Sequence, residues 1–421
     1  MNITIISKYA PVPGYGSNPR WFELGKRFIR HGHNVEIITS DSNHGSNFKV
    51  NEGHEASFKI DQVSFTVLKT MQYTKTASLR RVLSWFDFDL RLFRFKRQIR
   101  PDIIVISSLS LTTIIFGLYL KFFKRTKLVF EVRDIWPLTM VEEGAYSRLH
   151  PLYLLLRFLE LWGYRKADLI VGTMPNLKQH VSNSGVERPD SVFHTCGIGV
   201  DKDGVQPVGE FIFTTEIEEK IKNKIIVGYC GSIGLTNNLT DLFTFANNTT
   251  EKDLIFLIAG DGAERKKFEA QATNNQNILF LGKLNPEDVQ GFLRRCDILF
   301  LSTMPSKVWN YGQSMNKVVD YMLAGRFILA QYKGFPSMIN EANCGLFTDI
   351  KTLEQAFLEI ICLPEAERQQ RGSAGRQWIL QNQNYDDLAN RYITKLEDIC
   401  VLKSPSIKNN RKNNPISQNL E

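Results

Sequence analysis

The stretch 306–325, SKVWNYGQSMNKVVDYMLAG, places a glycine, a lysine and a carboxylate around the expected start of one short helix. Gly312 lets the backbone bend where a side chain would interfere. The N-terminus of a helix attracts phosphate, and Lys317 adds a positive charge there. Asp320 follows on the same helix face. A diphosphate at Lys317 and a ribose diol at Asp320 would form half of a nucleotide-sugar site, and the alternative is an ordinary amphipathic helix with one exposed ion pair.

Other residues of this helix are expected to fix its start and its packing. The free N–H groups at the helix start can be capped by Ser314 or Asn316. A hydrophobic core can receive the opposite face, which contains Val318, Val319 and Met322. The sequence therefore predicts a helix with one buried face and one face that offers charge to a ligand.

Chain length and composition indicate a globular protein of two or three domains, with 421 residues, 43% hydrophobic and 11% aromatic. The six cysteines are scattered without paired spacing, which argues against a zinc site or a disulfide framework and fits a reducing cytoplasm. Residues 1–7 are expected to form a buried strand, without the basic segment that opens a signal peptide. The apolar run 103–123 is interrupted by Ser and Thr, so we expect strand, loop and helix there and no membrane span.

Positive charge is concentrated in residues 1–205, which hold 28 Lys and Arg against 19 Asp and Glu, whereas the whole chain holds 52 against 44. The densest segment, 80–100, mixes basic and aromatic residues, which fits the surface of an anionic membrane. The alternative is a helix that packs its aromatic face on the core and leaves its arginines in solvent. Nucleic acid is a third possible partner, but we find no nucleic-acid-binding motif and expect none bound. Residues 151–164 predict a strongly apolar helix, either core or a second membrane-touching surface.

Short apolar runs alternate with amphipathic helical patterns along the chain, which predicts parallel sheets with helices on both faces. We predict an α/β fold of two doubly wound, Rossmann-like domains, 1–200 and 201–383, facing each other across a cleft. Residues 384–402 are expected to form a terminal helix that can cross back to the first domain, and the polar tail 403–421 is expected to be disordered. The expected strands are 3–7, 34–39, 65–68, 103–106, 127–131 and 169–172 in the first domain and 224–229, 254–259, 278–281, 298–302 and 327–331 in the second.

One glycine cluster follows the first expected strand, at the edge where ligands bind such folds. Gly14 and Gly16 could bring backbone amides against a phosphate or a sugar. The cluster is not the G-x-G-x-x-G fingerprint, because Pro19 stands where the third glycine belongs. A flexible surface loop is the alternative interpretation.

Two further glycine clusters end strands of the second domain. Segment 231–234, GSIG, leaves room for a phosphate and offers hydrogen bonds to it. Segment 260–262, GDG, precedes Arg265 in the first turn of a helix. Arg265 either reaches a phosphate or stays in solvent without a ligand.

A charged pair, Arg133 and Asp134, follows the expected strand 127–131 in the segment FEVRDIWP. Charged residues at the carboxyl end of a strand, facing a cleft, suit acceptor binding or proton transfer. A structural Arg–carboxylate pair is an equally good interpretation of these two residues.

The ordered set of these segments resembles the retaining GT-B glycosyltransferases of the large family four. The segments that carry the resemblance are KYAPVPGYGSNPRWFELGKRFIRHGHNVEIIT, FEVRDIWP, GYCGSIG, FLIAGDGAERKKFE, FLGKL and SMNKVVDYMLAG, and they span most of residues 1–400. The closest likeness is to the bacterial branch that adds amino sugars to O-antigen and capsule repeat units. The resemblance implies a UDP-sugar donor bound mainly by the second domain and an acceptor bound by the first. It also implies transfer that retains the anomeric configuration, without a bound metal or another cofactor.

The resemblance also assigns roles by position. The diphosphate would lie beside the first-domain glycines, Ser232, Asn316 and Lys317, whereas Gly282 and Lys283 would lie by the nucleobase. The ribose hydroxyls would bind Asp320. The predicted donor-binding residues are Gly14, Gly16, Gly231, Ser232, Arg265, Gly282, Lys283, Asn316, Lys317 and Asp320, and the predicted catalytic residues are Arg133 and Asp134.

On the donor side, the chain departs from the family pattern at two places. Many members have two glutamates eight positions apart, where this chain has Gly312 and Asp320. Many members also have an Arg and a Lys after the first strand of the second domain, where this chain has Ser232 and the segment 237–238, NN. The positive charge must then come mainly from Lys317 and Arg265.

On the acceptor side, the His that many family members carry after the strand 103–106 is replaced by Ser107 and Ser108. No catalytic His is therefore identified. Asp134 is the predicted acceptor-orienting residue.

The predicted function is transfer of a sugar, such as an N-acetylated amino sugar, from a UDP-sugar to a polyprenyl-diphosphate-linked or saccharide acceptor in bacterial surface polysaccharide synthesis. We expect a cytoplasmic protein, held peripherally at the anionic inner face of the cell membrane by its basic N-terminal half. One alternative is a nucleotide-sugar epimerase of the same fold, for which we see no clear carboxylate or His cluster. The other is a catalytically idle sugar-nucleotide-binding subunit, which the missing Glu and His would suit.

Overall fold

The computed structural model describes residues 1–16, 19–43, 45–74, 78–95, 98–144, 146–202, 209, 211–349 and 352–401. Some positions of interest lie outside this part of the chain. They are residues 17–18 of the first glycine loop, residues 96–97 of the basic segment, residues 203–208 between the predicted domains and the tail 403–421.

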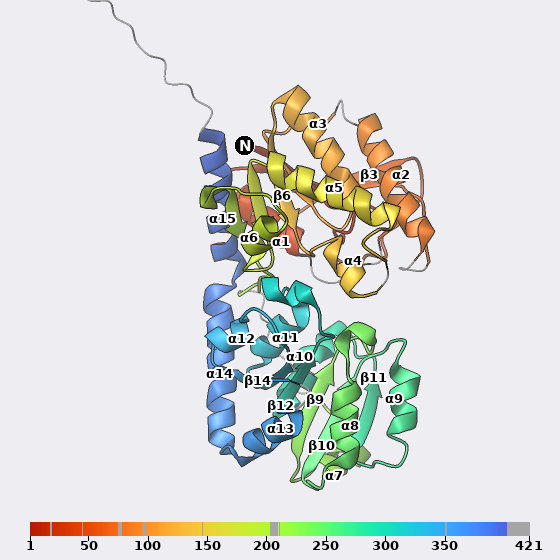
Figure 1. The fold of residues 1–421 in the computed structure, drawn as a ribbon, viewed down its shortest axis with the longest axis vertical. Helices are drawn as coiled ribbons and strands as arrows, with labels where there is room; N and C mark the ends of the chain where they lie inside the picture. The colour runs from red at the N-terminus through yellow and green to blue at the C-terminus, as the bar shows by residue number, and fades with distance from the viewer. Residues whose placement is uncertain are drawn as a thin grey trace, which may run out of the picture.

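The first half of the chain forms an eight-stranded sheet in the order β3-β4-β2-β1-β5-β6-β7-β8 (Figure 1). All neighbouring strands are parallel except β3 and β4, which pair antiparallel. The strands are β1 Asn2–Ile6, β2 Asn34–Ser40, β3 Glu55–Ile60, β4 Val63–Leu68, β5 Ile103–Ser107, β6 Lys127–Val132, β7 Leu169–Gly172 and β8 Phe193–Thr195. The helices are α1 Arg20–Arg30, α2 Leu79–Phe95, η1 Leu111–Thr113, α3 Ile114–Lys124, α4 Leu138–Glu142, α5 Pro151–Lys166, α6 Leu177–Asn183 and η2 Asp190–Val192.

The second half forms a six-stranded, fully parallel sheet in the order β11-β10-β9-β12-β13-β14. Its strands are β9 Ile225–Cys230, β10 Leu254–Ala259, β11 Ile278–Gly282, β12 Ile298–Ser302, β13 Phe327–Gln331 and β14 Gly345–Thr348. Its helices are α7 Thr215–Ile221, η3 Leu235–Asn237, α8 Thr240–Asn248, α9 Arg265–Gln271, α10 Pro286–Arg295, η4 Lys307–Tyr311, α11 Asn316–Ala324, α12 Met338–Glu341 and α13 Leu353–Cys362. Two long helices, α14 Glu365–Asn382 and α15 Tyr385–Val401, follow and run along one side of both halves (Figure 1).

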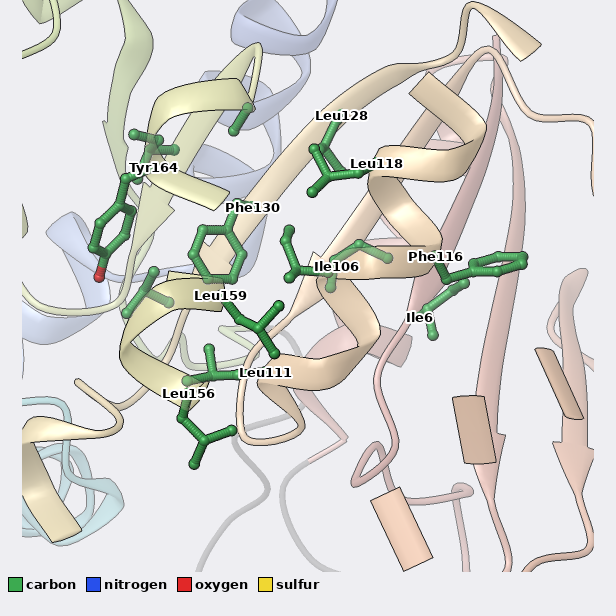
Figure 2. Close-up of a cluster of buried hydrophobic side chains, with 14 of the residues drawn as sticks. Ile6, Ile106, Leu111, Phe116, Leu118, Leu128, Phe130, Leu156, Leu159 and Tyr164 are labelled. Carbon is green, nitrogen blue, oxygen red and sulfur yellow. The ribbon is translucent and has the colours of Figure 1, made fainter. Parts of the chain in front are cut away.

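One face of the first sheet packs against α3 and α5, because apolar residues alternate with the sheet period in the strands and face the apolar stripes of both helices. Phe130 of β6 lies beneath α5, where a β-carbon at Gly163 would come within 2.9 Å of its ring. The glycine therefore allows the helix to approach the strand. Figure 2 shows this core, with Ile6, Ile106, Leu128 and Phe130 from the strands, Leu111, Phe116 and Leu118 from η1 and α3, and Leu156, Leu159 and Tyr164 from α5.

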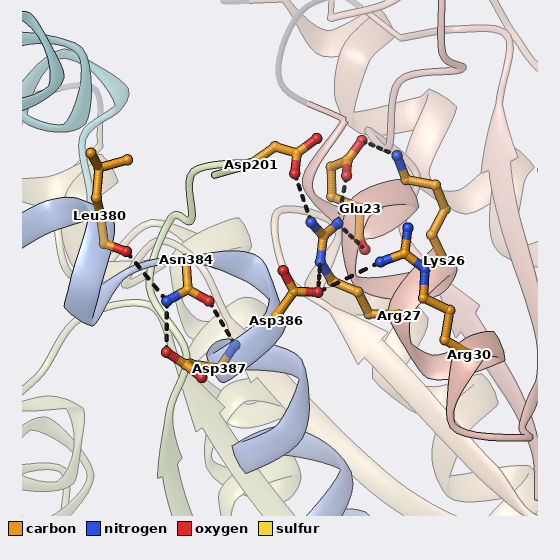
Figure 3. Close-up of polar contacts among 9 residues, drawn as sticks. All are labelled: Glu23, Lys26, Arg27, Arg30, Asp201, Leu380, Asn384, Asp386 and Asp387. Atoms are coloured by element: carbon orange, nitrogen blue, oxygen red, sulfur yellow. Dashed lines mark hydrogen bonds and ion pairs between the residues drawn. The ribbon is translucent and has the colours of Figure 1, made fainter. Parts of the chain in front are cut away.

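The opposite face of the first sheet is covered by α1 and by α15, the last helix of the chain. Tyr392 of α15 packs its ring against Trp21 (6.3 Å, tilted) and Phe28 (5.7 Å, edge to face) of α1 in this core. At the edge of the interface Arg27 bonds Asp386 of α15 (2.8 Å) and Asp201 (2.7 Å), as Figure 3 shows. The C-terminal helix thus belongs to the packing of the first sheet, although the division of the chain at residue 200 stays a prediction.

A buried ion pair holds the same layer together. Arg20 and Glu131 are 1% and 0% exposed and lie 3.1 Å apart. Ser107 also donates a hydrogen bond to the carboxylate of Glu131 (3.0 Å), and Arg20 donates to the carbonyl of Cys196 (2.8 Å). Glu131 of the FEVRDIWP segment is therefore a structural residue, whose loss would leave a buried charge unpaired.

The predicted strands of both sheets are confirmed, and 254–259, 298–302 and 327–331 match β10, β12 and β13 residue for residue. The sequence did not predict β3, β8 and β14, which are short or polar strands toward the sheet edges. No helix in the described part of the chain combines the length and the apolar composition needed to cross a membrane.

Candidate functional site

Three loops leave the carboxyl ends of β9, β10 and β11 side by side, because these strands are neighbours in the second sheet. The N–H of Gly231 donates to the carbonyl of Ala259 (3.0 Å), and the N–H of Gly260 donates to the carbonyl of Gly282 (2.7 Å). The glycine-rich strand ends that the sequence shows separately thus form one hydrogen-bonded edge.

Glycine is required at several positions of this edge. A β-carbon at Gly260 would lie 1.8 Å from the carbonyl oxygen of Gly231, and one at Gly262 would lie 2.3 Å from that of Ile233. Their φ angles, +146° and +158°, also disfavour other residues. A β-carbon at Gly231 would lie 2.8 Å from Cε of Lys317. The glycines therefore let the loops meet and leave space for the lysine.

Lys317, in the first turn of α11, extends over Gly231. Its Nζ donates to Oδ1 of Asn237 (2.8 Å) and to the hydroxyl of Tyr229 (3.0 Å), and lies 4.3 Å from the centre of the Tyr229 ring. Burial lowers the pKa of Lys317 to about 7, and the neighbouring Cys230 opposes this shift. No carboxylate in the described part of the chain pairs with this amine. An incoming phosphate would supply the missing negative charge.

Asp320 presents a half-buried carboxylate one turn further along α11. Within the described ranges no hydrogen bond or ion pair reaches this carboxylate, and burial raises its pKa to about 6. The exposed ion pair with Lys317, considered as an alternative, is therefore not formed. The predicted cap is wrong: Met315 occupies the N-cap position without a side-chain hydrogen bond. Asn316 is already the first helical residue, and Ser314 comes one residue too early.

The other predicted donor-binding residues of this half lie around the same edge. Arg265 begins α9, and its Nη1 lies 3.9 Å from the place where a β-carbon of Gly282 would be. Its Nε pairs with Glu269 (2.7 Å), so a protein carboxylate already partly balances this charge. The side chains of Ser232, Lys283 and Asn316 are exposed.

Gly312 lies where the two halves of the molecule touch. Its φ is +104°, and a β-carbon there would come within 2.4 Å of Cδ of Pro175. The preceding residue, Tyr311, accepts a backbone hydrogen bond from Asn176 (3.0 Å) and packs its ring against His180 (4.9 Å). A glutamate could not replace Gly312 without parting these contacts. The departure from the family pattern thus has a structural reason.

Arg133 and Asp134 follow β6 at the carboxyl edge of the first sheet. The Arg133 backbone is held by Ser108 (N–H to Oγ, 2.9 Å) and Thr173 (Oγ to carbonyl, 2.9 Å). Burial lowers the pKa of Arg133 and raises that of Asp134. Among the residues that the structure describes, neither side chain forms an ion pair, so the paired interpretation is wrong. Both residues are partly buried.

A cation–aromatic cluster that the sequence did not predict lies beside Asp134. The guanidinium of Arg81 lies over the rings of Tyr9 (5.6 Å) and Trp136 (5.4 Å). Lys8 is 2% exposed, donates to the carbonyl of Ser42 (2.8 Å), and its pKa is lowered to about 7 by burial. Only the position of Lys8 and Tyr9, soon after the first strand, could have indicated this cluster in the sequence.

The contacts of Gly14 and Gly16 lie within the first half of the chain. Gly14 has a φ of +81° and is exposed. Gly16 forms a bridge with Ser46, and a β-carbon there would lie 2.0 Å from the carbonyl oxygen of Gly45. This packing is sufficient to explain why position 16 is a glycine, so no ligand contact is needed to explain it. That Gly14 and Gly16 contact the donor stays a prediction.

A cavity of about 380 Å³ lies between the two halves of the molecule. It is lined by Thr173 and Thr195 of the first half, Val318 and Val319 of α11, and Trp378 of α14. None of the predicted donor-binding or catalytic residues lines this cavity. The cavity nevertheless adjoins both edges, because Thr173 also bonds the carbonyl of Arg133 and Val318 follows Lys317 in α11.

Two family models match the chain. Residues 15–197 match a glycosyl transferase 4-like domain, and residues 224–363 match the glycosyl transferases group 1 domain. The chain is a glycosyltransferase of the GT-B fold. The prediction of two parallel-sheet α/β domains is thereby confirmed. A comparison of the sequence with curated proteins found no match.

Solved structures of other glycosyltransferases share the fold. HepE from Anabaena, solved with UDP and glucose, has a TM-score of 0.64 and 13% identity, covering 94% of this chain and 100% of HepE. Sucrose-phosphate synthase from Thermosynechococcus elongatus has a TM-score of 0.69 and 14% identity, covering 95% and 99%. A UDP-forming α,α-trehalose-phosphate synthase from Burkholderia vietnamiensis has a TM-score of 0.69 and 12% identity, covering 96% and 98%. At these identities the likeness shows the fold alone.

Proposed function

We propose that this glycosyltransferase moves a sugar from a UDP-sugar to an acceptor held at the carboxyl edge of the first sheet. One observation carries the proposal: the amine of Lys317 lies over Gly231, at the glycine edge of β9–β11, without a carboxylate partner among the described residues. A diphosphate would complete this arrangement by charge and by backbone hydrogen bonds. The UDP named for HepE and for the trehalose-phosphate synthase supports uridine as the nucleoside.

The donor edge would stabilise the leaving group. When the bond between the sugar C1 and the phosphate oxygen breaks, negative charge grows on the diphosphate, where Lys317 and the loop amides after β9 would meet it. We infer retention of the anomeric configuration. The acceptor oxygen bonds to C1 on the face that the phosphate leaves, and its proton passes to the departing phosphate oxygen. Such a step needs no strong protein base, which fits a chain with Ser107 and Ser108 in place of the family's histidine.

The acceptor would lie against Arg133, Asp134 and the Arg81 cluster. An ionised Asp134 can accept a hydrogen bond from an acceptor hydroxyl and so aim its oxygen at C1. Tyr9 and Trp136 offer ring faces of the kind on which sugar rings stack. We propose a saccharide or a polyprenyl-diphosphate-linked acceptor for this edge, because the guanidinium groups of Arg81 and Arg133 suit an anionic headgroup.

The finer parts of the proposal follow from the resemblance and the charge of the first half. We propose an amino-sugar donor, a place in bacterial O-antigen or capsule synthesis, and peripheral attachment to the inner face of the cell membrane. Basic residues concentrated in the first half support that attachment.

Purified full-length protein, a panel of UDP-sugars and a lipid-linked acceptor would test the proposal. We expect acceptor-dependent release of UDP and a product in which the sugar keeps its anomeric configuration by NMR. Interconversion of UDP-sugars without an acceptor would instead identify an epimerase. UDP binding without turnover of any donor would identify an idle binding subunit. Lys317→Ala should weaken UDP binding whether the protein transfers the sugar, interconverts UDP-sugars or only binds them, whereas Lys266→Ala, at an exposed lysine on α9, should not.

A further inference from the structure

Three helices of the first half expose apolar stripes to solvent. Leu79, Leu83, Phe86 and Leu90 repeat at helical spacing on α2, so they share one side of that helix. The exposed fractions are 74% for Leu79, 75% for Phe123 and 83% for Leu149. The exposed apolar residues of this α2–α3–α5 face are Leu79, Leu83, Phe86 and Leu90 on α2, Ile115, Phe122 and Phe123 on α3, Leu149 before α5, and Leu154, Leu155 and Phe158 on α5.

The stripes belong to one surface. The helix α3 packs against both α2 and α5 (Figure 1). Phe93 of α2 packs its ring against Tyr119 of α3 (5.6 Å), and Tyr119 packs against the exposed Phe123 (5.2 Å). The inner sides of α3 and α5 fill the core of Figure 2, and the inner residues of α2, such as Trp85 and Phe88, belong to the same core cluster. Core packing therefore accounts for one side of each helix and leaves the apolar outer side unexplained.

The exposed charged residues of these three helices are all basic. The acidic residues of the three helices are Asp87, Asp89 and Glu160. Asp87 pairs with Arg91, whereas Asp89 and Glu160 are buried. Their exposed basic residues are Arg80, Arg94, Lys124, Arg165 and Lys166. An apolar surface whose helices expose basic residues is complementary to an anionic lipid bilayer.

Elsewhere in the described part of the chain, exposed large apolar side chains are scattered. They are Tyr15, Met71, Ile212, Leu235, Leu358 and Val401, which belong to separate elements. Single exposed apolar residues are normal on soluble proteins, whereas many of them on three neighbouring helices indicate a binding surface.

We propose that the α2–α3–α5 face docks on an anionic membrane, with Phe122, Phe123 and Phe158 inserted between the lipids. The inference rests on the proposed function, because it supplies the surface from which a lipid-linked acceptor is taken. The first turn of α2 carries Arg81, whose guanidinium lies over the aromatic rings beside Asp134. One helix thus connects the bilayer contact to the acceptor edge, about one helix diameter, roughly 10 Å, away.

Binding of the full-length protein to vesicles would test this face. We expect co-sedimentation with vesicles of phosphatidylglycerol and phosphatidylcholine that weakens with salt, and little binding to phosphatidylcholine alone. The triple variant F122S/F123S/F158S should bind anionic vesicles about tenfold more weakly or worse. Leu358→Ser, an exposed leucine on α13, is the matched control and should bind as the wild type does.

A charge variant provides an independent test in case the triple variant misfolds. R94E/K124E changes two exposed residues and should lower binding to anionic vesicles and flatten its salt dependence. Lys266→Glu on α9 should do neither. Wild-type binding by both face variants would overturn the proposal. So would a wild-type dimer that the triple variant dissociates, because a second copy of the chain would then cover the face.

UDP affinity, measured on the same samples, separates this inference from the proposed function. Both face variants should keep wild-type UDP affinity, because the face lies outside the donor edge. A wild-type protein that docks on vesicles but fails to bind UDP would contradict the proposed function and leave the membrane face standing. UDP binding and turnover without vesicle binding would contradict the membrane face alone.

Discussion

The carboxyl edges of the two sheets present different chemical groups. The edge of the second sheet consists of backbone, where Gly231, Gly260 and Gly282 join three loops and Lys317 adds the charge. The edge of the first sheet consists of side chains, with Arg81 on aromatic rings beside Asp134. Backbone amides suit a group that is the same in every donor, such as a diphosphate. Side chains suit an acceptor that differs between related enzymes.

The strongest test of this contrast is a single methyl group on the donor edge. Gly260→Ala would force a β-carbon against the carbonyl of Gly231 at a φ of +146°. We expect a loss of about 3 kcal/mol or more in loop stability and UDP affinity roughly a hundredfold lower. Calorimetric titration with UDP and thermal unfolding would measure both.

The matched control for that variant is Gly32→Ala. Gly32 has a φ of +81° and no atom within 4 Å of its β-carbon position. The substitution should lower the free energy of unfolding by only about 1 kcal/mol and leave UDP affinity unchanged. Equal effects of the two substitutions would contradict a backbone-built donor edge.

Asp134→Asn should separate the two edges most cleanly. The amide keeps the shape but loses the charge that we propose orients the acceptor, so we expect transfer roughly a hundredfold slower. UDP affinity should stay within error of the wild type, because Asp134 lies in the other sheet. Initial rates of transfer and UDP titration, measured on one preparation, would test this prediction. A parallel fall of both quantities would place Asp134 in the donor site instead.

Lys317→Ala should weaken UDP binding by about 1.5–3 kcal/mol, the value of a charge-assisted hydrogen bond. This corresponds to a loss of roughly ten- to a hundredfold in affinity. Fluorescence or calorimetric titration with UDP would measure it, with Lys266→Ala as the exposed control. Unchanged affinity in a folded variant would remove Lys317 from the site.

The smallest expected effect is a pH dependence on the donor side. Because burial lowers the pKa of Lys317 to about 7, the free enzyme loses this charge as the pH rises above that value. UDP binding favours the protonated amine, so affinity should fall by up to about tenfold per pH unit above 7. Lys317→Arg keeps its charge and should flatten the profile, and an equally steep profile in this variant would assign the titration to another group.

The contrast between the edges also explains what the sequence could predict. Short apolar runs that end in glycine or another turn residue, such as 254–259, form the buried strands of both sheets, so the two sheets and the glycine edge could be located from the sequence. The backbone freedom of glycine is known from the residue type alone, so its role can be predicted without the tertiary structure. The cation–aromatic cluster joins Tyr9, Arg81 and Trp136 from three distant parts of the chain. No local sequence pattern could predict that these residues lie together.

Gly312 shows the same limit on a single residue. The sequence predicts a bend there, and the structure confirms the positive φ. Its closest neighbour, however, is Pro175 from the other half of the molecule, which only the assembled fold can reveal. The missed capping of α11 has a local cause, because a shift of one residue in the helix start changes which side chain could reach the free N–H groups.

The packing of α15 has a consequence for how the protein is made. Until residues 385–401 are synthesised, Trp21 and Phe28 of α1 lack their contact with Tyr392, so part of one face of the first sheet stays uncovered. The half that is synthesised first is therefore the half that is completed last. A fragment that ends before Tyr385 would carry an open apolar surface, and adding residues 385–401 as a separate peptide should restore its solubility.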